Sequence, residues 1–186
     1  MRKVLFNCPY LGIGAIRWIA ASWAEGFKRC GYEFHTCDDA RLLNSKCREL
    51  QPDILYCDIV STPIEEVECR NLLSEMRRQG TKVVMNVYWP LTDQPGLRAI
   101  ALKDFDVADL YCGEREPDSM LGFEQFTGKT YVTMPQSANP HFHRASRPDP
   151  RFAYDIVFVG GKLPRKRWFN DNVLKVLRKR YRVALF

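Results

Sequence analysis

Short apolar runs alternate with amphipathic segments along residues 1–134, and this alternation constrains the fold more than any other feature of the sequence. The runs are rich in β-branched and aromatic residues, as strands are, and the segments between them carry apolar residues at helical spacing. The expected strands span 3–7, 32–37, 53–57, 82–89, 107–112 and 129–134, and the expected helices span 15–29, 41–50, 65–79, 97–105 and 118–126. This alternation predicts an α/β fold with a doubly wound, mostly parallel, Rossmann-like sheet.

The same order of strand, glycine turn and helix starts again at Tyr154. An apolar run over 154–159 precedes Gly160 and Gly161, and an expected helix over 168–180 and a strand over 181–186 follow. One strand-helix-strand unit of about 30 residues cannot cover both faces of its own strands. We therefore expect the first βαβ fragment of a second Rossmann-like domain whose remainder lies outside this chain. The expected parts are an N-terminal domain over 1–134, a Pro-rich linker over 135–153 and the start of a C-terminal domain over 154–186.

Composition favours a globular protein of the cytoplasm. Hydrophobic residues make up 46% of the chain, but no apolar run approaches the roughly 18–20 residues that a membrane span requires. The first residues, Met1 to Asn7, lack the apolar core of a secretory signal. The seven cysteines are odd in number, scattered and without a C-x-x-C pair, so we expect reduced, buried thiols and no metal site.

The net charge of +6 is concentrated in one segment. Residues 162–182 contain nine basic residues and one acid, which leaves the rest of the chain at a net charge of −2. A uniformly basic surface for nucleic acid is therefore not expected. The segment is either a local anion site or a solvated helix end.

Ligands of doubly wound folds bind beyond the carboxyl ends of the strands. The residues that follow each expected strand are therefore the ones to examine: 8–14, Asp38 and Asp39, Asp58, 89–93, and Gly113 with Glu114. Gly12-Ile-Gly14 in the first of these loops is close to the dinucleotide fingerprint G-x-G-x-x-G, with Asp38 as the ribose-binding acid. Arg17 stands where the third glycine belongs, so the loop is either a dinucleotide site or a turn that admits another ligand.

Two further segments can each be interpreted either as part of a functional site or as a purely structural feature. Gly160-Gly161-Lys162, followed by Arg165, Lys166 and Arg167 at a helix start, suits a phosphate, or these cations are simply solvated. In the loop over 87–96, Asp93 lies between two prolines. It is placed either to accept a proton from a sugar hydroxyl or to cap the next helix.

Several of these segments together resemble the CgeB-like glycosyltransferases, which have two facing Rossmann-like domains in the GT-B architecture. The resemblance is carried by W-x-x-x-D-x-P over 89–95, Phe105-Asp106, 134–140, 154–160 and the Arg-bearing helix after them. Because each motif is short, the resemblance rests on the order and the spacing of the motifs. Asn139 departs from the pattern, because such proteins often have an acid there.

The resemblance implies transfer of a sugar from a nucleotide-sugar donor to an acceptor hydroxyl, a hexosyltransferase-type activity without a metal and without a covalently bound cofactor. The N-terminal domain would hold the acceptor and the C-terminal domain the donor, so this chain alone should be inactive and a partner could complete it. The implied roles are catalysis by Asp93, acceptor binding by Gly12, Gly14, Trp89 and Glu114, and binding of the donor diphosphate by Gly160, Gly161, Arg165 and Arg167.

Two other hypotheses stay open at this point. One is a dinucleotide-dependent oxidoreductase domain that uses the glycine turn at Gly12 and Gly14. The other is a non-catalytic module that binds a nucleotide, a polyanion or a protein partner through the basic residues of 162–182.

Overall fold

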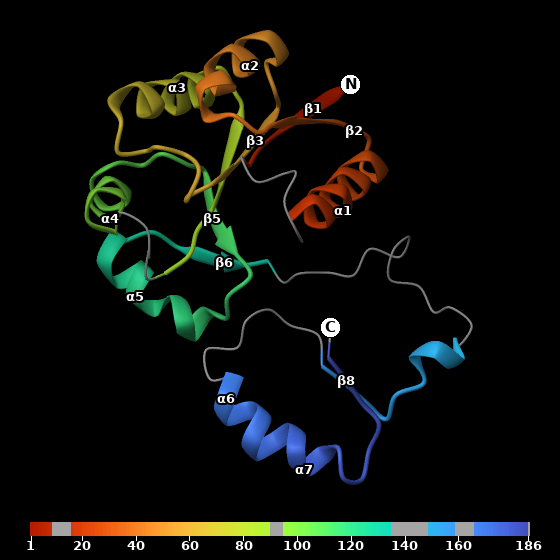
Figure 1. Ribbon diagram of the computed structural model, residues 1–186. Coiled ribbons are helices and arrows are strands. Elements are labelled where there is room, and N and C mark those ends of the chain that lie inside the picture. The colour runs from red at the N-terminus through yellow and green to blue at the C-terminus, as the bar shows by residue number, and fades with distance from the viewer. Residues whose placement is uncertain (9–15, 90–94, 135–148, 159–165, 186) are drawn as a thin grey trace. The chain divides into compact units, whose positions relative to one another are not determined.

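The computed structural model describes residues 1–8, 16–89, 95–134, 149–158 and 166–185 (Figure 1). The chain divides into two compact units, Met1–Asn139 and Pro140–Phe186. The first unit contains a six-stranded sheet in the order β2-β1-β3-β4-β5-β6, and every neighbouring pair is parallel. Its strands are β1 (Arg2–Asn7), β2 (Tyr32–Cys37), β3 (Ile54–Asp58), β4 (Lys82–Asn86), β5 (Leu110–Gly113) and β6 (Tyr131–Thr133).

Five α-helices alternate with these strands, which confirms the expected α/β class with a parallel sheet flanked by helices. They are α1 (Ile16–Arg29), α2 (Leu43–Leu50, after a short 3-10 turn), α3 (Val67–Arg78), α4 (Pro95–Asp104) and α5 (Pro117–Thr127). Two strands differ most from the expected ranges. β4 ends at Asn86 instead of residue 89, and β5 starts at Leu110 instead of residue 107. The later start has a visible cause, because the backbone N–H groups of Val107 and Ala108 donate to the Tyr111 hydroxyl instead of a neighbouring strand.

The strand order is the flavodoxin-like one, in which β1 has β2 on one side and β3 on the other. A Rossmann sheet has the order 3-2-1-4-5-6, so the Rossmann-like expectation holds only at the level of a doubly wound parallel sheet. Asn7 at the end of β1 is in register with Cys37 of β2 and with Cys57 of β3. From β1 the chain adds β2 on one side of the sheet and then adds β3 to β6 on the other side. The strand order therefore reverses between β1 and β3.

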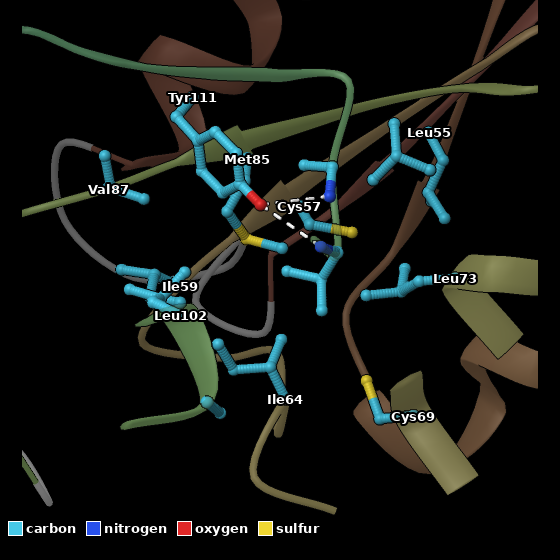
Figure 2. Close-up of a cluster of buried hydrophobic side chains, with 14 of the residues drawn as sticks. Leu55, Cys57, Ile59, Ile64, Cys69, Leu73, Met85, Val87, Leu102 and Tyr111 are labelled. Atoms are coloured by element: carbon cyan, nitrogen blue, oxygen red, sulfur yellow. Dashed lines mark hydrogen bonds between the residues drawn. The ribbon is translucent and has the colours of Figure 1, made fainter. Parts of the chain in front are cut away.

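One face of the sheet packs against α2, α3, α4 and α5. Figure 2 shows part of this cluster, in which Leu55, Cys57 and Met85 of the sheet meet Leu73 of α3 and Leu102 of α4. All five of these side chains are fully buried. This face supplies most of the apolar core of the first unit, and the buried thiols of the chain lie largely within it.

The other face packs against α1, the only α-helix that contributes to this second cluster within the described residues. The ring of Tyr56 lies 4.9 Å from that of Phe6 and 5.2 Å from that of Trp23. Farther along the sheet, Val84 and Leu110 are only partly buried, and Val132 of β6 is 42% exposed. The sheet is therefore covered unequally on its two faces.

The second unit has the expected order of strand, helix and strand. β7 (Ile156–Phe158) and β8 (Val183–Leu185) are parallel. The helical segment between them comprises α6 (Lys166–Phe169), a π-helical stretch (Asn170–Leu174) and α7 (Lys175–Leu177). The Asp155 carboxylate accepts the Arg182 backbone N–H at 2.7 Å, which ties the start of β7 to the residue before β8.

Six of the seven cysteines are buried and only Cys30 is exposed, and all seven are free thiols, as expected. Across the described ranges, no helix combines the length and the apolar composition needed to cross a membrane.

A core substitution tests the packing of α3 on the sheet. We expect Leu73→Ala to lower the free energy of unfolding by about 2–5 kcal/mol, because Leu73 is fully buried and its truncation leaves a cavity. Leu97→Ala is the matched control, because Leu97 is 65% exposed on α4, and its effect should stay below about 0.5 kcal/mol. Urea unfolding followed by circular dichroism measures both. Equal losses would contradict the packing described here.

Candidate functional site

Three polar side chains form a hydrogen-bonded triad at the carboxyl edge of the sheet. Asp58 ends β3, Asn86 ends β4, and the two residues are in register. The Asn86 side-chain amide donates to Asp58 Oδ2 at 2.9 Å and to the Tyr88 hydroxyl at 2.8 Å, and that hydroxyl lies 3.2 Å from Asp58 Oδ2. All three residues are partly buried, so the triad is ordered by its surroundings yet within reach of solvent.

All the side-chain donors of the triad are engaged within it, whereas some of its acceptor positions remain open. Asn86 has two side-chain N–H groups and Tyr88 one O–H, and these meet Asp58 and each other. Asp58 Oδ1 also accepts the Val60 backbone N–H at 2.9 Å. An ionised carboxylate has about four lone-pair positions, so Asp58 can still accept a hydrogen bond from a ligand. The arrangement suits a ligand that donates hydrogen bonds.

Electrostatics keep Tyr88 in its neutral form. Burial, and then the negative charge of Asp58, raises the pKa of the Tyr88 phenol well above its usual range, and Glu114 acts in the same direction. Tyr88 therefore retains its proton, and can donate to Asp58, up to a higher pH than an ordinary tyrosine. Glu114 is the only residue expected at the acceptor site that the described structure brings electrostatically close to the triad.

The loop that follows Asp58 is held by buried polar contacts. The Thr62 backbone N–H donates to the Asp58 carbonyl at 2.9 Å, and the fully buried Thr62 side chain accepts a hydrogen bond from Asn7 Nδ2 at 3.2 Å. Arg98 of α4 pairs with Glu65 at 3.0 Å and donates to the Val60 carbonyl at 2.6 Å. Because these contacts reach the loop from β1 and from α4, they fix the backbone on which Asp58 depends.

Asn7 carries a buried polar atom without a partner at this edge. Its side chain is fully buried, its amide nitrogen donates to Thr62, and its Oδ1 has no hydrogen-bond partner among the residues that the structure describes. A buried unsatisfied acceptor costs about 1–3 kcal/mol. The polar side chain of Asn7 at the end of β1 therefore lowers the stability of the fold.

Gly113 at the end of β5 allows a close approach of the backbone to the triad. A Cβ atom there would lie 2.8 Å from the Val87 carbonyl oxygen, 3.0 Å from the Tyr131 hydroxyl and 3.2 Å from Asn86 Oδ1. Contacts under 3.0 Å to backbone require a shift of the structure. Only glycine fits this position without displacing the strand residues that carry Asn86.

Trp89, expected at the acceptor site, lies against α5. Its indole nitrogen is 2.8 Å from the position that a Cβ on Gly122 would take, and its ring lies 5.9 Å from that of Phe123. Arg115 Nη1 donates to the Trp89 carbonyl at 3.0 Å. These contacts give the side chain a packing role and fix the chain as it leaves β4.

The remaining predicted site residues are not brought together by the described structure. Arg167 is 98% exposed and lies 4.0 Å from the Asp171 carboxylate on the same helical segment. Asp39, which follows β2, accepts hydrogen bonds from the backbone and side chain of Arg41. The other predicted site residues lie outside the described ranges: Gly12, Gly14, Asp93, Gly160, Gly161 and Arg165.

The sequence interpretation missed Asn86 and Tyr88 as functional candidates. The available signal was a polar residue inside an otherwise apolar strand, at the position that aligns with Asp58 if β3 and β4 are neighbours. The structure shows that β3 and β4 are neighbours and that Asn86 is in register with Asp58, which makes Asn86 a candidate site residue. The described residues contain no group of three or more His, Cys, Asp or Glu side chains that could hold a metal ion.

The anchor of the Asp58 loop can be tested by breaking its ion pair. We expect Arg98→Met to lower the free energy of unfolding by about 3 kcal/mol, because it leaves the Glu65 carboxylate, only 15% exposed, without its partner. The double variant Glu65→Leu/Arg98→Met should recover part of that loss. Lys46→Met is the control, because it breaks an exposed pair with Glu49 that is worth about 0–1 kcal/mol. A loss for Arg98→Met no larger than for this control would contradict the anchoring role.

The raised pKa of Tyr88 predicts a loss of stability at alkaline pH. The unfolded chain gives up the phenol proton near pH 10, while the folded chain keeps it to higher pH. The free energy of unfolding should therefore fall as the pH rises above about 10. Tyr88→Phe removes this contribution, so its stability should fall less steeply between pH 9 and 11.

The control for this measurement is Tyr32→Phe, which removes a hydroxyl from β2 at the edge of the same sheet. Urea unfolding under reducing conditions at several pH values gives the three slopes. A Tyr88→Phe slope equal to that of the wild type would show that Tyr88 is not held in its neutral form.

Comparisons with known proteins bear on the fold. No family model matches the chain, and no curated protein matches it. The solved structures that match include the Vibrio cholerae chemotaxis protein CheY4, with 17% identity over 76% of this chain and 91% of its own and a TM-score of 0.38. Another is the Thermotoga maritima response regulator TrrA in complex with Mg²⁺ and BeF, with 16% identity over 67% of this chain and 96% of its own and a TM-score of 0.40. A third is the N-terminal domain of a response regulator receiver protein from Methanoculleus marisnigri, with 16% identity over 70% of this chain and 99% of its own and a TM-score of 0.42. Likeness at this level carries no statement about function.

These findings overturn the expected family. The chain matches no glycosyltransferase model, and the structures named above are chemotaxis and response regulator proteins. These comparisons therefore contradict the CgeB-like GT-B assignment, with its hexosyltransferase activity and its nucleotide-sugar partner, and they also contradict the oxidoreductase alternative. The physical reason is that short motifs after successive strands recur in every doubly wound fold, so their order and spacing do not identify one family. The third hypothesis, a non-catalytic module that binds through the basic residues of 162–182, stays a prediction.

Proposed function

We propose that residues 1–134 form a domain that binds a small polar ligand at the carboxyl edge of its sheet. Asp58 accepts a hydrogen bond from the ligand, and Asn86 and Tyr88 hold the carboxylate in place. The observation that carries this proposal is the partly buried triad, whose donors are all engaged while the carboxylate keeps room for one more. The role is one of binding, and no chemical step is assigned to it.

The place of the triad in the fold supports this function. Ligands of open parallel sheets bind at the point where the strand order reverses, and here that point lies between β1 and β3. Asp58 is the last residue of β3, and Asn7, with its unpartnered Oδ1, is the last residue of β1. Both strands therefore end in a polar residue at the edge where a ligand is expected.

The rigidity of the Asp58 loop supports it further. Val60, Thr62 and Glu65 are each fixed by a contact from another element or from Asp58 itself. A site that is already ordered before binding loses less conformational entropy when the ligand arrives. A pre-organised binding edge accounts for these contacts.

Substitution of Asp58 tests the proposal. The 186-residue protein is screened against small polar metabolites by thermal shift, and the dissociation constants of compounds that raise the melting temperature are measured by calorimetry. We expect Asp58→Asn to weaken their binding about 10- to 100-fold, because a hydrogen bond to a charged group contributes about 1.5–3 kcal/mol.

Glu49→Gln is the matched control, because it makes the same change of charge at a side chain that is 67% exposed on α2. It should leave binding unchanged. If no compound raises the melting temperature, or if Asp58→Asn binds every one of them as well as the wild type does, the proposed site is wrong.

A further inference from the structure

We propose that the ligand presents a positively charged amine to Asp58, and that the site discriminates against neutral hydroxyl compounds and against anions. This inference rests on the proposed function of the same edge. It follows from the hydrogen-bonding capacity and the charge of the groups around Asp58.

The hydrogen-bonding capacity of the triad disfavours an anion. An anion accepts hydrogen bonds, so its site must supply free donors. Both N–H groups of the Asn86 amide and the O–H of Tyr88 are already engaged within the triad, and the Val60 N–H is engaged with Asp58 Oδ1. The groups of the triad that remain for a ligand are acceptors, namely Asp58, the Tyr88 oxygen and the Asn86 side-chain oxygen. All three require a donor.

Two arginines that contact the segments carrying the triad already have partners. Arg98 pairs with Glu65 and donates to the Val60 carbonyl, and Arg115 donates to the Trp89 carbonyl. Within the part of the chain that the structure describes, Asp58 takes part in no ion pair, and its hydrogen bonds come from neutral groups. Its negative charge is therefore not compensated by a described side chain.

Other acidic residues follow β5 and the Asp58 loop. Glu114, the residue after β5, is close enough to raise the pKa of Tyr88. Helix α3 begins just beyond the Asp58 loop with Glu66 at its N-cap and Glu68 in its first turn. Acids at these positions offset the positive end of the helix dipole, so this helix start does not provide the anion site that helix N-termini often form.

An ammonium group fits what remains. It carries three donors and a positive charge, so it can donate both to Asp58 and to the free lone pair of the Tyr88 oxygen. Because Asp58 is partly buried, its attraction for a cation is stronger than it would be in bulk water. A hydroxyl in the same place would supply one donor and no charge.

Nuclear magnetic resonance of the ¹⁵N-labelled 186-residue protein provides the test. The probes are ethanolamine, ethylene glycol and acetate, of which the first two differ only in one ammonium or hydroxyl group. The reporters are the Val60 backbone N–H and the Asn86 side-chain amide, because both are bonded to Asp58. We expect ethanolamine to shift both signals saturably, at least about tenfold more tightly than ethylene glycol, and acetate to shift neither.

The variants and the salt dependence complete the test. Asp58→Asn should abolish the ethanolamine shifts, Glu49→Gln should retain them, and added sodium chloride should weaken them by screening. If ethylene glycol binds as tightly as ethanolamine, and both are lost in Asp58→Asn, the inference about charge is overturned while the proposed binding site stands. If no probe shifts either reporter, or if the shifts persist in Asp58→Asn, the site fails together with the inference.

Discussion

The site depends on the reversal of strand order between β1 and β3. β1 pairs with β2 on one side and with β3 on the other, so α1 packs on one face of the sheet while α2, α3, α4 and α5 pack on the opposite face. Crossovers to opposite faces leave the carboxyl ends of the two central strands without a helix passing over them. The partly buried Asp58 lies at this edge, and Asn86 reaches it because β4 is the next strand, in register.

The polar groups at this edge are ordered at some cost to stability. Asp58 is held by Val60, Asn86 and Tyr88, and its loop is held by contacts from β1 and α4. Within the described ranges, Asn7 leaves a buried amide oxygen without a partner, which an apolar residue of similar size would avoid. Natural chains break local rules of stability mainly where function requires it. The coincidence of an unsatisfied acceptor and a rigid, acceptor-rich edge is thus more informative than either feature alone.

Local patterns predicted the elements well, because strand and helix periodicity are properties of short segments. They also marked Asp58 as a strand-end residue. They could not identify Asn86 and Tyr88, whose relation to Asp58 depends on β3 and β4 being neighbours in one register. Nor could they show that the Trp89 ring packs over Gly122 of α5, a contact between segments about 30 residues apart. Contacts set by strand order and helix packing are the part of the site that a single sequence does not reveal.

The same limit explains why the resemblance to a glycosyltransferase was misleading. Doubly wound domains share glycine turns and polar strand ends whatever they bind, so these features report the fold rather than the ligand. What separates one such edge from another is its charge and its balance of donors and acceptors. Many edges present a helix N-terminus or a cation and therefore take phosphates. Here the described edge presents a carboxylate whose neighbours have no donor left and whose nearby arginines are bound elsewhere. The ligand preference must therefore be argued from these contacts and not from the fold.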